Sequence, residues 1–345
     1  MSSGDVNAHT HLYSGLAPLG LPAPDPPPRN FSEILERVWW KLDRALDPAT
    51  LRASARFYVA EALLAGTTGL VDHHESPRFI DGSLDVIADA CEELGLPAVV
   101  CYGATERNGG REEARRGLRE CRRFIEANTR PFVRGGVGLH ASFTVSDETL
   151  REAGELAREL KTVVHVHVAE DRADVDDARQ RGFAGPLERL LELGALPPGS
   201  IVAHGVHLDV EQVRRCEAEG LWLVHNPRSN ANNRVGWARS LGASARVALG
   251  TDGFASDLVA EEAALLAEAR AHGEPSRAVV SRRAAGRHLF SAFFPDLSAR
   301  VEPGRIAIGG REVVDSGRLA GADAEEIRAH AREAAPLLWK RMNEL

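Results

Sequence analysis

Short apolar runs alternate with amphipathic stretches along this chain of 345 residues. Runs of four to eight apolar or β-branched residues predict buried strands, whereas apolar residues spaced three and four apart predict helices with one buried face. Strand candidates start near residues 6, 67, 97, 133, 162, 200, 221 and 247, and a helical pattern separates most of them. Eight such units predict an α/β protein with a closed (β/α)8 TIM barrel, and a doubly wound open sheet is the alternative.

Glycine and capping residues mark the ends of the predicted helices. The helix over 48–65 ends at Gly66, the helix over 83–94 ends at Gly95, and Ser146 is placed to cap a later helix. No GxGxxG motif follows the first strand, which disfavours the dinucleotide-binding form of the open sheet.

The chain beyond residue 300 has a different pattern. Residues 305–314 predict a β-hairpin that turns at a Gly-Gly pair. Residues 324–345 predict an amphipathic helix with a kink or break at Pro336. We therefore expect a barrel over residues 5–300 and a tail of hairpin and helix over residues 301–345.

A proline-rich loop, Tyr13–Asn30, follows the first predicted strand. Its run of prolines excludes a helix, because each proline lacks a backbone donor and restricts the residue before it. A long loop at this place is a candidate lid or substrate wall, and a plain surface connection is the alternative.

Composition narrows the classes of function. The net charge of −8 argues against a nucleic-acid groove, which needs a basic patch. No apolar run is long enough to span a bilayer, and the first residues do not resemble a secretory signal. Four cysteines without CxxC spacing suggest idle thiols in a cytoplasmic protein: Cys91, Cys101, Cys121 and Cys216.

Histidines gather at the predicted C-terminal ends of the strands, which meet at one mouth of a barrel. Strand side chains alternate between faces, so His9 and His11 point the same way and could hold one divalent cation. Each buried imidazole needs a polar partner, and so many on one rim indicate a site. The polar residues at strand ends are His9, His11, His73, His74, His140, His165, His167, Glu170, His204 and Asp252.

Five short motifs follow one another along the chain, and their combination is more specific than any one of them. These are His9-Thr10-His11, His167-Val168-Ala169-Glu170, His204, His225–Asn230 and Gly250-Thr251-Asp252-Gly253. Together they resemble the amidohydrolase superfamily, in its deaminase and chlorohydrolase branch. Finer segments resemble the SsnA group of aminohydrolases: Asn7–Ser14, Trp39–Arg44, Asp72–His74 and Gly138–Thr144.

This resemblance implies a role for each residue. Glu170 would carry protons, and His204 would hydrogen-bond the water or the substrate. The implied ligands of one divalent ion, zinc or alternatively iron, are His9, His11, His167 and Asp252. The implied pocket residues are His140, His73 and His74.

Spacing leaves some of these roles open. His165 shares a strand face with His167, and His207 competes with His204. His73, His74 and His225 could equally lie behind the site as supporting or packing residues. The carboxylates expected to lie on a solvated helix start are Asp257, Glu261 and Glu262.

The resemblance implies hydrolytic deamination of an amino-substituted, purine- or pyrimidine-like heterocycle, a small-molecule substrate. The alternatives are hydrolysis of a cyclic amide or halogenated heterocycle, or a barrel that binds metal or ligand without turnover. Relatives usually carry an accessory β-sandwich, and we expect most of it to be missing here. The remaining hairpin would expose an edge, so we also expect association into a homo-oligomer.

Overall fold

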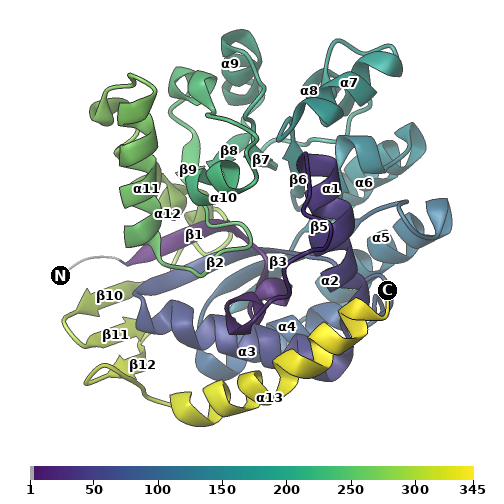
Figure 1. The fold of residues 1–345 in the computed structure, drawn as a ribbon. Helices are drawn as coiled ribbons and strands as arrows, with labels where there is room; N and C mark the ends of the chain where they lie inside the picture. The colour runs from purple at the N-terminus through teal and green to yellow at the C-terminus, as the bar shows by residue number, and fades with distance from the viewer. Residues whose placement is uncertain (1–3) are drawn as a thin grey trace.

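The structure is a computed structural model that describes residues 4–345, and its centre is a parallel β-barrel (Figure 1). Each barrel strand pairs in parallel with the next, and a bridge between Thr10 and Asp252 joins the last strand to the first. The predicted (β/α)8 barrel is therefore confirmed. Its strands are β1 (Asp5–Thr10), β2 (Thr67–His74), β3 (Ala98–Ala104), β5 (Val137–Ala141), β6 (Val164–Val168), β7 (Ile201–His204), β8 (Trp222–His225) and β9 (Val247–Leu249).

The fourth barrel strand is interrupted. The segment predicted as one strand from residue 133 is divided at Gly136 into β4 (Val133–Gly135) and β5. Both parts pair with β3. The approach to β3 is close, because a Cβ on Gly138 would lie 2.3 Å from the Tyr102 carbonyl oxygen. Glycine is required where two backbones come this near.

Helices surround the barrel and begin at polar caps. The Ser146 hydroxyl accepts a hydrogen bond from the Thr149 N–H, as its predicted capping role requires. After the proline-rich loop come α1 (Phe31–Ile34), a π-helical turn (Leu35–Trp39) and α2 (Trp40–Ala45). The others are α3 (Pro48–Leu64), α4 (Ser83–Leu94), α5 (Gly110–Ala127), α6 (Asp147–Glu159), α7 (Arg172–Gln180), α8 (Pro186–Glu192), α9 (Val210–Ala218), α10 (Pro227–Asn232), α11 (Leu258–Ala271) and α12 (Ser281–Ser291).

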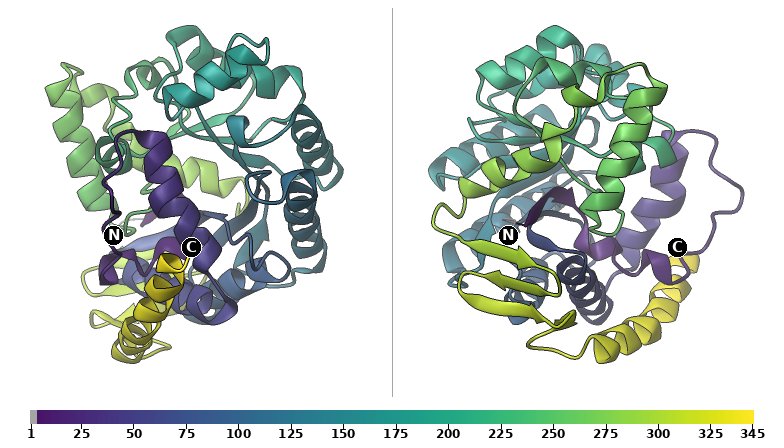
Figure 2. Two further views of the ribbon diagram at one scale, coloured as in Figure 1. Left: turned by 45° about the vertical axis from the view of Figure 1, so that its right-hand side comes forward. Right: turned by 90° about the vertical axis from the view of Figure 1, so that its left-hand side faces the viewer.

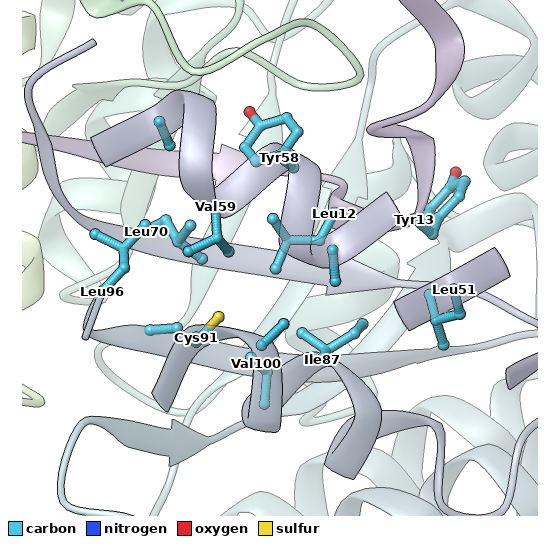
Figure 3. Packing of buried hydrophobic residues seen from close by; sticks show 14 of the residues in the cluster. Leu12, Tyr13, Leu51, Tyr58, Val59, Leu70, Ile87, Cys91, Leu96 and Val100 are labelled. Atoms are coloured by element: carbon cyan, nitrogen blue, oxygen red, sulfur yellow. The ribbon is translucent and has the colours of Figure 1, made fainter. Parts of the chain in front are cut away.

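The largest part of the core lies between the barrel and its outer helices. Figure 3 shows Leu70 of β2 and Val100 of β3 packed with Val59 of α3 and Ile87 and Cys91 of α4. These side chains are fully buried. Burial of aliphatic side chains on both faces of a parallel strand explains why the strands read as continuous apolar runs.

The tail forms a small sheet beside the barrel, and a long helix follows it (Figure 2). The sheet has four antiparallel strands instead of the two predicted, because short charged strands at both edges carry little apolar pattern. Its strands are β10 (Ala299–Glu302), β11 (Arg305–Ile308), β12 (Arg311–Asp315) and β13 (Arg318–Leu319).

The final helix, α13 (Ala324–Asn343), contacts α3 and continues through Pro336. The predicted break does not occur. Pro336 is exposed, whereas Ile327, Ala331 and Leu338 are buried in the core that includes α3, and this packing holds the helix on both sides of the proline. None of the helices within residues 4–345 combines the length and apolarity needed to cross a membrane.

Candidate active site

Three imidazoles and one carboxylate converge at the C-terminal mouth of the barrel. The ligand atoms of His9, His11, His167 and Asp252 all lie within 4.8 Å of one another. His11 Nε2 lies 2.9 Å from Asp252 Oδ1 and 3.4 Å from His167 Nε2. His9 Nε2 lies 3.4 Å from the same Asp252 oxygen. His9 lies on β1 and His11 directly follows it, whereas His167 lies on β6 and Asp252 in the segment after β9. Only the closed barrel brings these segments together.

The imidazole rings are oriented by their other nitrogens. His11 Nδ1 lies 2.5 Å from the His73 carbonyl oxygen, and His167 Nδ1 lies 2.5 Å from the His140 carbonyl oxygen. Each Nδ1 must donate there, which leaves Nε2 as the nitrogen that faces the cluster. His9 Nε2 is buried and makes no hydrogen bond of acceptable geometry within the described chain. A divalent cation would satisfy this atom, so the donor set fits a metal ion.

Charges at the cluster suit metal binding. Burial opposes ionisation of Asp252, but the adjacent imidazoles of His11, His9 and His204 hold the pKa of Asp252 well below its usual range. Burial lowers the pKa of His9 to about 3, which keeps that imidazole neutral. Burial also acts on His11, but the Asp252 hydrogen bond and charge outweigh it and raise the pKa of His11 to about 9. A cation must therefore displace a proton from His11.

The structure separates His165 from His167. His165 lies deeper along β6, where its Nε2 is 2.9 Å from His9 Nδ1. Its other ring nitrogen lies 3.9 Å from the Cys101 sulfur. His165 therefore supports the ring of His9 from behind, while His167 faces the cluster.

Glu170 and His204 lie together beside Asp252. Glu170 Oε2 is 3.6 Å from His204 Nε2, and the Asn233 side-chain amide donates to Glu170 Oε1 over 3.3 Å. Burial raises the pKa of Glu170 to about 7, against the opposing effect of His204. A carboxyl group with a pKa near neutrality can both accept and return a proton.

A hydrogen bond holds His204 in this position. His204 Nδ1 lies 2.9 Å from Asn230 Oδ1, and its backbone has a φ of 72° at the end of β7. His207, the competing residue, is half-buried and lines a separate surface pocket between α7, α8 and α9. The structure therefore brings His204, and not His207, to the cluster.

A central pocket opens above the ligand cluster. Its walls include His140 and five aromatic side chains: Tyr13, Phe31, Trp39, Trp40 and Phe143. A larger chamber of about 860 Å³ adjoins it, and Trp39 and Gly253 border both. Pro24, Pro27 and Pro28 line this outer chamber, so the proline-rich loop is a wall of the entrance. Flat, partly apolar walls suit a planar ring.

His73 and His74 lie behind the pocket. His73 Nε2 lies 3.0 Å from the Leu139 carbonyl oxygen, and its Nδ1 is 2.7 Å from Glu75 Oε1. His74 Nε2 is 2.8 Å from the Ser76 hydroxyl. The residue of this segment that lines the pocket is Glu75. Burial disfavours its charge, but His73 and the neighbouring histidines hold the pKa of Glu75 well below its usual range.

Comparison with known sequences assigns the family. Residues 2–282 match the model of the Amidohydrolase family. The chain belongs to the amidohydrolase family.

Two curated relatives of this amidohydrolase are deaminases. The chain is 31% identical over 262 residues to the 5-methylthioadenosine/S-adenosylhomocysteine deaminase of Thermoanaerobacter pseudethanolicus. This alignment covers 74% of this chain and 57% of the relative. It is 30% identical over 271 residues to the 8-oxoguanine deaminase of Pseudomonas aeruginosa, and that alignment covers 74% of this chain and 60% of the relative. The amidohydrolase thus spans less than two thirds of the length of these relatives.

Solved structures share the fold. A zinc-bound adenosine deaminase from Xanthomonas campestris aligns with a TM-score of 0.79 at 22% identity, over 99% of this chain and 86% of that one. The zinc complex of the atrazine chlorohydrolase TrzN from Arthrobacter aurescens aligns with a TM-score of 0.78 at 20% identity, over 97% and 88%. At these identities the likeness concerns the barrel fold of the amidohydrolase.

The sequence analysis assigned no pocket role to several residues that line the pocket of the amidohydrolase, although it singled out the segment Trp39–Arg44. Glu75 follows β2 much as Glu170 follows β6, and this position was a usable signal. Trp40 and Asp43 lie one helical turn apart on α2, and Asn233 follows α10. Only the fold places these helices over the mouth of the barrel.

One of the carboxylates predicted to lie on a solvated helix start is buried instead. Glu261 was expected on a solvated helix start, but its side chain is fully buried in α11 and forms an ion pair with Arg228. The Arg228 N–H also donates to Glu261 Oε1 over 2.9 Å. Burial raises the pKa of Glu261 to about 6. Asp257, in contrast, caps α11 by accepting from the Val259 and Ala260 N–H groups.

Proposed function

We propose that this amidohydrolase is a metal-dependent hydrolase that deaminates an amino-substituted nitrogen heterocycle of purine or pyrimidine type. The convergence of His9, His11, His167 and Asp252 beside Glu170, at the base of an aromatic pocket, is the observation that carries this proposal. The named activities of the deaminase relatives support it.

We assign the four converging residues as ligands of one divalent ion, zinc in the first place and iron as the alternative. Imidazole and carboxylate ligands suit both metals, and three imidazoles with one carboxylate leave a coordination position for a small molecule. When bound, such an ion supplies Lewis acidity, which lowers the pKa of a water and polarises the substrate.

The remaining steps belong to side chains of this chain. Glu170 accepts one proton from the attacking water and passes it to a ring nitrogen. It then carries the proton of the newly formed hydroxyl group to the amino group, which departs as ammonia when the C–N bond breaks. His204, held by Asn230, hydrogen-bonds the attacking water or the oxygen that forms at the reacting carbon. The Ser229 hydroxyl donates to Asp252 Oδ2 and so holds the carboxylate in place.

Ammonia release tests the reaction. Zinc-loaded protein is incubated with a panel of aminated purines, pyrimidines and triazines, and free ammonia is measured. Ammonia from at least one member supports deamination. Release of chloride from halogenated rings, or ring opening of cyclic amides without ammonia, would replace it with one of the alternative hydrolyses. No turnover of any compound tested would favour the alternative of a barrel that binds metal or ligand without catalysis.

Glu170→Gln separates the chemistry from the metal. The amide keeps the shape of the side chain but cannot accept a proton, so turnover should fall by roughly 10²–10⁴, while zinc content by elemental analysis stays unchanged. His167→Ala is the matched variant and should lose zinc and turnover together. Wild-type turnover of Glu170→Gln would disprove the proton-carrier role, and loss of zinc would make Glu170 a ligand.

A further inference from the structure

Two neighbouring side chains in the wall of the central pocket each contain a polar atom that has no hydrogen-bond partner in the part of the chain that the structure describes. Trp40 and Asp43 both line the pocket, and they lie three residues apart on α2, on one face of the helix. Within the described chain, Trp40 Nε1 and Asp43 Oδ1 are buried and have no hydrogen-bond partner. The first can only donate and the second, as a carboxylate oxygen, can only accept.

Arg107 holds both side chains in place. Its Nη2 donates to Asp43 Oδ2 over 2.8 Å, and its guanidinium lies over the Trp40 ring, 4.8 Å from the ring centroid. Its Nε donates to the Thr105 hydroxyl over 3.1 Å. Arg107 therefore fixes one oxygen of Asp43 and leaves the other available. Asp43 and Arg107 are 2% and 6% exposed, so water screens this arrangement little.

Unpaired donors and acceptors are costly to bury, and each one in a folded protein requires an explanation. Packing alone does not explain an unpaired donor and an unpaired acceptor on two side chains that line the same ligand pocket. A bound ligand that offers an acceptor beside a donor would pair both atoms at once. Pre-organised groups of this kind give specificity, because a ligand without the matching group leaves them unpaired.

We propose that Trp40 and Asp43 read a donor–acceptor edge of the substrate, in which a ring carbonyl or ring nitrogen faces Trp40 and an adjacent N–H faces Asp43. This inference rests on the proposed function and narrows its substrate class. The substrate is an aminated heterocycle that also carries a lactam or amidine edge directed away from the metal ligands. Rings substituted only by halogen, alkyl or alkoxy groups at that edge lack the N–H and are excluded.

Binding of small ring fragments tests the edge directly. Zinc-loaded protein is titrated at pH 8 with 2-pyridone, which has the lactam edge, and with N-methyl-2-pyridone, which keeps the carbonyl and lacks the N–H. Burial raises the pKa of Asp43 to about 6 against the charge of Arg107, so the carboxylate is ionised at this pH. We expect 2-pyridone to bind at least about tenfold more tightly. The amidine 2-aminopyridine shows whether that edge is also accepted.

Two variants test whether Asp43 Oδ1 and Trp40 Nε1 are the atoms that bind the lactam edge. Asp43→Asn keeps the size of the side chain. Its amide oxygen takes the hydrogen bond from Arg107, so an NH2 donor replaces the free acceptor oxygen and the tenfold preference for 2-pyridone should disappear. Trp40→Phe keeps an aromatic ring over Arg107 but removes the N–H, so both pyridones should bind about tenfold more weakly. Trp39→Phe, in the neighbouring residue of the wall, is the control and should leave the ratio of affinities unchanged. Circular dichroism and zinc content confirm that each variant is folded.

The proposal is overturned if wild-type protein binds neither pyridone, binds both equally, or keeps the preference after Asp43→Asn. These outcomes are independent of turnover. If the preference is found and no aminated heterocycle releases ammonia, the binding edge stands and the proposed deamination fails.

Discussion

Each imidazole at the barrel mouth has two nitrogens, and what occupies one decides what the other can do. His11 and His167 donate from Nδ1 to backbone carbonyl oxygens, which a mutation cannot remove. His9 differs, because its Nδ1 is paired with the side chain of His165. The orientation of His9 is therefore the one that a single substitution behind the cluster can disturb.

His165→Phe removes that partner and should weaken zinc binding by about 10–100-fold, the usual effect of losing a supporting residue. Affinity is measured by competition with a chelator of known strength. His207→Ala, on the surface pocket, is the control and should bind zinc as wild type does. An unchanged affinity for His165→Phe would show that the residue does not orient His9, and complete loss of zinc, as in His167→Ala, would make it a ligand.

At the scale of elements, glycines set how closely helices and strands approach. Gly154 lies in the middle of α6, where alanine would normally be favoured by about 1 kcal/mol. A Cβ at this position would lie 2.0 Å from the Gly194 carbonyl oxygen in the loop after α8. Because the obstacle is backbone, the loop itself would have to move.

Gly154→Ala should therefore destabilise the protein by about 1–3 kcal/mol, the range for overpacking, despite the gain in helix propensity. Urea unfolding followed by circular dichroism measures the change. Glu155→Ala, on the exposed side of the same helix, is the control and should stay within about 0.5 kcal/mol of wild type. A neutral or stabilising Gly154→Ala would mean that α6 does not pack this closely on the loop.

At the scale of the whole molecule, a bound ion would join β1, β6 and the segment after β9 through the proposed ligands. Binding to the folded state alone raises stability by about 2.7 kcal/mol when free zinc is about 100 times its dissociation constant. Chelation should therefore lower the thermal midpoint and added zinc should restore it, as calorimetry can measure. Asp252→Ala loses the anionic ligand and should show little response to zinc. Equal midpoints for wild type with and without zinc would contradict the site.

Self-association stays a prediction. It rested on a two-stranded hairpin with an exposed edge, whereas the tail is a four-stranded sheet. One edge strand, β10, carries Arg300 and Glu302, and charges of this kind oppose edge-to-edge pairing. Light scattering over a wide range of concentrations decides the matter. A dimer would support the expectation, and a monomer throughout would remove it.

How much the sequence alone could determine depended on the range of the interactions involved. Strand and helix type, the cap at Ser146 and the shared face of His9 and His11 follow from neighbours in sequence, because side-chain period and capping are local. The count of eight units then indicated the barrel. The charged edge strands and the unbroken helix at Pro336 did not follow, since pairing and packing with distant residues override local preference there.

The candidate site shows the same division. Residue types at strand ends were enough to predict a metal cluster, because all strands of a barrel end at one mouth. The sequence could not rank His165 against His167, which share a face and differ only in depth. Nor could it place Asp43 and Trp40 on the pocket wall, because their position depends on how α2 lies across the barrel. Depth, orientation and contacts between elements are properties of the three-dimensional packing, and only the tertiary structure decided them.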